Sequence, residues 1–257
     1  IHMTISKKAI LFLFSTLITC SQLVAQVAGG KEQKLFDMYV MGEYEKCADR
    51  AMKMTENDKT KYDSEPYLYV ALSMLKINDD PELAEYYPDA LRDALKYAAK
   101  FTKRDDRLRD KEEEYILDQN MDHINMFKEI ALREGKGYFV QEDYRKAVYY
   151  YKLGQKIDPR DPVMQMIKGV GDLYSRNTRT GQEEIDEAIA KFKEQAQNGT
   201  FEKNESTVMA FEDAFIYYGE YLKEKGDRTE AQMVAKLARE LDPKNAKFER
   251  LQENVGG

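Results

Sequence analysis

The chain has 257 residues, of which 34% are charged and 42% hydrophobic, and its formal net charge is −7. This acidic balance disfavours nucleic acid as a partner, because contacts to phosphates need an excess of lysine and arginine. The large apolar content excludes a disordered tail. Pro (6) and Gly (14) are few, and Ala, Leu, Lys, Glu and Met are plentiful. We therefore predict an all-α fold without a sheet.

Residues 1–25 have the pattern of a secretory signal peptide. Lys7 and Lys8 precede an apolar run over 9–19, and Ala25 follows in a stretch of small residues. The run is too short to anchor the chain across a bilayer. We expect cleavage after Ala25 and export to the periplasm or outer membrane of a bacterium; a retained helix of the fold is the alternative. Cleavage would leave 38 of the 40 basic side chains against 47 acidic ones, a net charge of −9.

Cys20 offers a different maturation route. Residues 17–20 (LITC) resemble a lipobox, in which the cysteine is lipidated and attaches the protein to a membrane. Thr19 departs from that pattern, because a smaller residue is usual before the cysteine, so we favour soluble export over lipidation. After cleavage Cys47 would be the only thiol, which excludes an intramolecular disulfide. We expect Cys47 to be a small buried contact between helices.

The rest of the chain, over 26–250, reads as one array of helical hairpins with a short tail at 251–257. Five hairpins follow one another at about 31–62, 64–103, 118–161, 163–200 and 206–245. The second has a long connection between its two helices, and the fourth has an apparent insertion at 177–182. The charged stretch 102–112 leaves open whether the array is one rigid body or two arcs joined by a hinge.

The third and fifth hairpins superimpose without a gap, at steps of 3, 9, 4, 3 and 5 residues. The matching positions are Gly135, Tyr138, Ala147, Tyr151, Gly154 and Pro159 in the third, and Gly219, Leu222, Ala231, Ala235, Ala238 and Pro243 in the fifth. Steps of 3 and 4 place residues on one helical face, and the step of 9 spans a turn. Small residues there would let two helices approach closely.

This spacing resembles the tetratricopeptide repeat, which has a Gly and a Tyr in its first helix, an Ala and an aromatic residue in its second, and a closing Asp-Pro. The other three hairpins depart from it, by lacking the closing proline or by their longer connections. The resemblance implies a right-handed α-α superhelix in which the first helices of successive hairpins line a concave groove.

The resemblance maps a set of aromatic, aliphatic and charged residues onto this groove. They are Phe36, Tyr39, Leu72, Leu132, Lys136, Phe139, Lys168, Tyr217 and Glu220. Such a lining suits an extended peptide or a partner's helix. The alternative is that several of them are core between repeats, since a shift of one position exchanges groove for core. The carboxylate clamp of chaperone-binding members is not reproduced around Lys136.

We expect no catalytic residue, cofactor or metal. His123 would be the only histidine after export, which excludes a histidine-based metal cluster. Gly135-Lys136-Gly137 lacks the third glycine and the preceding strand of a dinucleotide loop. Consecutive glutamates at 112–114 point about 100° apart on a helix and cannot converge on one substrate atom.

The sequence therefore predicts a non-enzymatic adaptor of the bacterial cell envelope that binds a polypeptide segment. One alternative is an outer-membrane lipoprotein subunit of an assembly or secretion machine, anchored through Cys20. A further alternative is a glycan-binding helical lipoprotein, which the Tyr-rich composition permits and the absence of Trp weakens.

Overall fold

The fold is built from helices alone in the part of the chain that this computed structural model describes, residue 27 and residues 29–256. That part holds twelve α-helices, one short 3-10 helix and no strand. The α-helices are Gln33–Val40 (α2), Tyr44–Glu56 (α3), Glu65–Asp79 (α4), Pro81–Tyr86 (α5), Ala90–Asp110 (α6), Met121–Val140 (α7), Tyr144–Ile157 (α8), Pro162–Tyr174 (α9), Thr178–Asn198 (α10), Val208–Glu224 (α11), Arg228–Leu241 (α12) and Ala246–Gly256 (α13), and η1 is Leu117–Asn120. The all-α prediction is confirmed. The leader and Cys20 lie outside the described residues.

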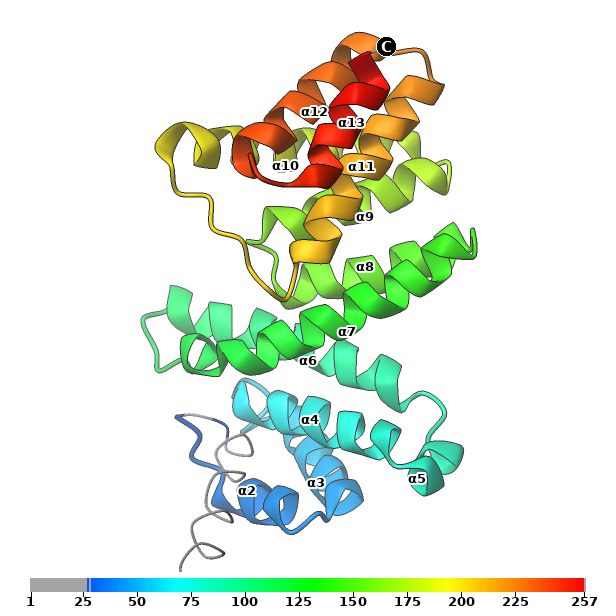
Figure 1. Cartoon of the computed structure of the whole chain (residues 1–257). Helices are drawn as coiled ribbons and strands as arrows, with labels where there is room; N and C mark the ends of the chain where they lie inside the picture. Colours follow the sequence, from blue (N-terminus) through cyan, green and yellow to red (C-terminus); the bar gives the residue numbers. More distant parts are fainter. Residues whose placement is uncertain (1–26, 28, 257) are drawn as a thin grey trace, which may run out of the picture.

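The helices pack as successive pairs, each on the next. The pairs α2/α3, α4/α6, α7/α8, α9/α10 and α11/α12 are joined by contacts of α3 with α4, α6 with α8, α8 with α9 and α9 with α11. In Figure 1 the pairs rise from α2 and α3 in blue to α11, α12 and α13 in orange and red. The right-handed superhelix remains a prediction.

Four of the hairpins turn in the same way. Three residues separate the two helices, and the middle one has a positive φ. That residue is Gly42, Glu142, Arg176 or Gly226, with φ of 77°, 60°, 69° and 83°. Glycine adopts this conformation without a steric penalty, whereas Glu142 and Arg176 adopt it under strain. The turn geometry is therefore retained even where its preferred residue is missing.

The second hairpin departs from this plan because its connection forms a helix of its own. Pro81 begins α5, and the Asp80 carboxylate caps it by accepting hydrogen bonds from the backbone N–H groups of Glu82 (2.9 Å) and Leu83 (3.3 Å). Proline at the first position and aspartate before it are both favourable at a helix start. The long connection is thus ordered structure between α4 and α6.

The charged stretch 102–112 lies mostly within α6, which continues to Asp110. Asp105 is buried there and accepts hydrogen bonds from Ser64 Oγ (2.6 Å) and from the backbone N–H groups of Ile116 (3.0 Å) and Leu117 (2.6 Å). A buried carboxylate with three donors fixes the segments that supply them. Asp105 therefore holds α4 and the approach to α7 against α6.

The insertion predicted at 177–182 in the fourth hairpin is wrong, because α10 already begins at Thr178. Here α9 and α10 cross backbone to backbone. A Cβ added at Gly169 would lie 2.9 Å from the Gly181 carbonyl oxygen, and one at Gly181 would lie 2.8 Å from that of Gly169. Gly169, Gly181, Ile185 and Ala188 follow the spacing of Gly135, Ala147, Tyr151 and Gly154. The fourth hairpin is thus a regular copy that lacks the closing Asp-Pro.

Small residues bring the paired helices together, as the sequence predicts. Cys47 is a free, fully buried thiol whose Sγ donates to the Leu35 carbonyl oxygen (3.4 Å). Burial raises the pKa of this thiol. Gly135 lies directly against the Tyr151 ring, with no room for a side chain. The expected packing roles of Cys47 and Gly135 are confirmed.

Candidate binding groove

The predicted groove residues of the first two hairpins lie in or against the core. Tyr39 is buried and makes edge contacts with Tyr44 and Tyr69, and Phe36 packs against the same cluster. Leu72 is only 2% exposed. The predicted groove placement of both residues is corrected accordingly: Tyr39 is held among the rings of Tyr44 and Tyr69, and Leu72 belongs to α4, which is buried on every face from Glu65 to Leu75.

Phe139 and Tyr217 meet across the molecule instead of lining an open trough. Their rings stack with centroids 4.7 Å apart, so α7 touches α11 over the end of α9. Tyr174 packs on Phe139 (5.1 Å), and its hydroxyl donates to the Tyr217 carbonyl oxygen (3.2 Å). Phe139 is 6% exposed. These aromatic residues close one end of the groove.

Lys168 is a structural cation rather than a groove contact. It is buried, and its Nζ lies 2.9 Å from an Asp172 carboxylate oxygen and 2.7 Å from one of Glu184, which joins α9 to α10. Two carboxylates around one ammonium satisfy its charge. Glu220 remains exposed on α11. Desolvation of its carboxyl group by the surrounding protein, and the nearby charge of Glu224, raise its pKa.

The cluster of Phe139, Tyr174 and Tyr217 is here called the aromatic closure. Beside it, the first helices α7, α9 and α11 enclose a hollow of about 350 Å³, here called the groove hollow. It contains two of the predicted residues, Leu132 and Lys136. The remaining lining residues are Glu129, Arg133, Tyr151, Ile167, Glu205, Ser206, Met209, Ala210 and Asp213. The Lys136 ammonium bridges α7 to Asp213 of α11 at 2.7 Å. The hollow therefore has an apolar floor and a charged rim.

A second, more open hollow of about 610 Å³ adjoins the first and shares Glu129, Glu205 and Ser206 with it. We call it the acidic hollow. It lies between α7 and the segment 199–207, which connects α10 to α11. Asn204 Nδ2 and Ser206 Oγ hold this segment on α7 by donating to Asn125 Oδ1, each at 3.4 Å. The connecting segment thus forms one wall of both hollows.

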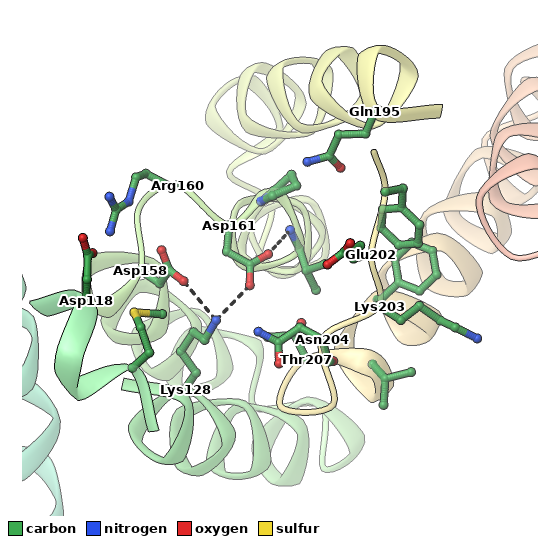
Figure 2. Close-up of a pocket in the computed structure, with 16 residues that line it drawn as sticks. Asp118, Lys128, Asp158, Arg160, Asp161, Gln195, Glu202, Lys203, Asn204 and Thr207 are labelled. Carbon is green, nitrogen blue, oxygen red and sulfur yellow. Dashed lines mark hydrogen bonds and ion pairs between the residues drawn. The ribbon is translucent and has the colours of Figure 1, made fainter. Parts of the chain in front are cut away.

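A third hollow of about 430 Å³ lies on the connecting segment's other flank, between it, α7 and the start of α9. Figure 2 shows Lys128 reaching from α7 toward Asp158 and Asp161. The Lys128 side chain is 1% exposed, and its Nζ donates to the two carboxylates at 2.9 and 3.1 Å. Burial raises the pKa of Asp161 although Lys128 opposes the rise. Lys128 therefore clamps α7 to the α8–α9 turn.

Three residues of these hollows escape sequence reasoning. An isolated lysine on a helix is normally solvated, so nothing marks Lys128 as buried. Glu129 stands three residues before Leu132 and hence on the same helical face, a signal that could have added it to the groove. Met209 stands just after a polar loop, where the sequence has no periodic pattern that would tell a residue on the rim of the groove hollow from one in the core.

Within the described residues, no three or more His, Cys, Asp or Glu side chains are grouped so as to hold a metal ion. None of the helices in that part of the chain combines the length and apolar character of a membrane-spanning helix. His123 is buried in α7. Neither the known family models nor the curated proteins contain a match to this chain.

Proposed function

We propose that this protein is a non-catalytic adaptor, exported to the bacterial envelope, that holds a polypeptide segment in the groove hollow. The observation that carries this proposal is the apolar floor enclosed by the first helices α7, α9 and α11 of three successive hairpins. A volume of about 350 Å³ lies at the small end of ligand pockets and suits one large side chain of a longer partner.

The walls of the groove hollow fit this use. Leu132, Ile167 and Ala210 supply buried apolar surface from three different helices. Met209 is 62% exposed at the rim, and its flexible thioether can adapt to an incoming side chain. The Lys136–Asp213 ion pair spans α7 and α11 and so sets the width of the opening. Because the opening is preformed, less conformational entropy is lost when a partner binds.

A peptide selection tests the proposal. A phage library of random dodecapeptides is panned on the protein, and each recovered peptide is measured against Met209→Asp and the matched control Met233→Asp. Met233 is 51% exposed on α12 and lines none of the three hollows. We expect Met209→Asp to weaken binding about tenfold, because a charge would replace an apolar rim contact, and Met233→Asp to leave it unchanged.

The melting temperature of both variants should match that of the parent protein, since both positions are exposed. If the library yields no peptide whose binding depends on Met209, the groove hollow is not a polypeptide site and the proposal fails.

A further inference from the structure

We infer that the partner segment carries a lysine or arginine close to the apolar side chain that enters the groove hollow. This inference rests on the proposed function and specifies the chemistry of the occupant. The apolar hollow locates the site, and the charges around its open end select what lies beside the apolar side chain.

Three glutamates lie at the open side of the groove hollow. Glu129, Glu202 and Glu205 line the acidic hollow, and no ion pair with any of them forms among the described residues. All three are exposed. They therefore present a negative potential to whatever chain leaves the groove hollow.

The two neighbouring lysines are held by other carboxylates. Lys203 lies 2.9 Å from Asp242, and Lys136 lies 2.7 Å from Asp213. Arg133, on the rim of the groove hollow, lies 3.7 Å from Glu134. The only basic residue that lines the acidic hollow is thus already paired, and the unpaired charge there is negative. An acidic partner segment would be repelled, and a basic one attracted.

The geometry sets where the basic residue falls in the partner. Glu129 and Leu132 are three residues apart on α7, so their side chains are neighbours on one face, about 5 to 6 Å apart at Cβ. In an extended peptide, side chains two positions apart point the same way and are separated by about 7 Å. An apolar side chain above Leu132 therefore brings a basic residue within two positions of it to Glu129.

The test pans the same dodecapeptide library in parallel on the wild-type protein and on the triple variant Glu129→Gln, Glu202→Gln, Glu205→Gln. The matched control carries the three substitutions Glu56→Gln, Glu85→Gln and Glu253→Gln, which replace exposed glutamates on α3, α5 and α13 that line none of the three hollows. Wild type and control should enrich Lys and Arg within two positions of an apolar residue. The triple variant should retain the apolar residue and lose the basic one.

Synthetic peptides from the wild-type selection then give the size of the effect. Replacing the basic residue by Gln should weaken binding to wild type about three- to tenfold at low salt, and by less at physiological salt, because exposed charges are screened. The triple variant should bind both forms equally.

The outcomes separate the two proposals. Peptides that depend on Met209 but show no basic enrichment, or the same enrichment on the triple variant, would overturn this inference and leave the polypeptide site standing. A library without any Met209-dependent peptide would overturn both.

Discussion

The first helix of the second hairpin, α4, and the first helices of the third and fifth hairpins, α7 and α11, are used in different ways. In α4 every residue from Glu65 to Leu75 is buried and most are apolar, so the place where a groove is expected is filled. In the C-terminal region, α7 and α11 touch only at points such as the Lys136–Asp213 pair and leave the groove hollow between them. A helix with apolar residues on every face demands burial, whereas an amphipathic one can leave a face open. Hairpins of the same type can thus contribute their first helix either to the core or to a groove.

Removing the Lys128 ammonium is expected to disrupt the C-terminal region most. Lys128→Met would leave the partly buried carboxylates of Asp158 and Asp161 without a cation and should lower the free energy of unfolding by about 4 kcal/mol. Urea denaturation followed by far-UV circular dichroism measures the loss.

Two further variants test whether the loss of the Lys128 charge causes the loss of stability. Lys203→Met breaks a half-exposed pair with Asp242 and should change stability by no more than about 1 kcal/mol. Adding Asp158→Asn and Asp161→Asn to Lys128→Met should recover part of the loss. A Lys128→Met protein as stable as the parent would contradict the clamp.

The contrast between filled and open regions is tested by truncating one leucine in each. Leu72→Ala empties a site enclosed on all sides and should cost about 3 kcal/mol. Leu132→Ala should cost about 2 kcal/mol, because that side chain already borders a hollow. Denaturant midpoints measured side by side give the difference, and a larger loss for Leu132 would reverse the assignment of the two regions.

Substitution of Phe139 tests whether this residue belongs to the aromatic closure or to the binding surface. Phe139→Leu removes the stacking on Tyr217 and should destabilise the protein by about 1.5 kcal/mol. Peptides selected on the groove hollow should still bind the folded variant, since Phe139 does not line it. An unchanged melting temperature together with lost peptide binding would instead place Phe139 in the binding surface.

The smallest expected effect concerns the shared turn. Glu142→Gly should raise stability by about 0.5 to 1 kcal/mol, because it relieves a positive φ at an exposed position, and Gly226→Glu should lower it by a similar amount. Thermal denaturation of the pair tests whether the two hairpins really have equivalent turns. Changes of the same sign in both variants would show that they do not.

Much of the helical plan was predictable from the sequence. The first and third hairpins, which contain Cys47 and Gly135, have the predicted helices and turns. The signals that predict them, which are the helical period, the turn residues and the small packing residues, all lie within a few residues of one another in the sequence. The regular form of the fourth hairpin was not predictable, because Gly181 has the sequence context of a loop and only its contact with Gly169 identifies it as a packing position. A glycine is a turn signal and a packing position alike, and only the partner helix distinguishes the two uses.

By itself, the sequence determined that this chain forms helical hairpins and where two of them repeat, since those features depend on local spacing. Only the tertiary structure decided that Leu72 is core while Leu132 borders a hollow, and that Lys128 is buried between two aspartates. Those outcomes depend on how one hairpin lies on the next, and contacts between residues far apart in the chain set that arrangement.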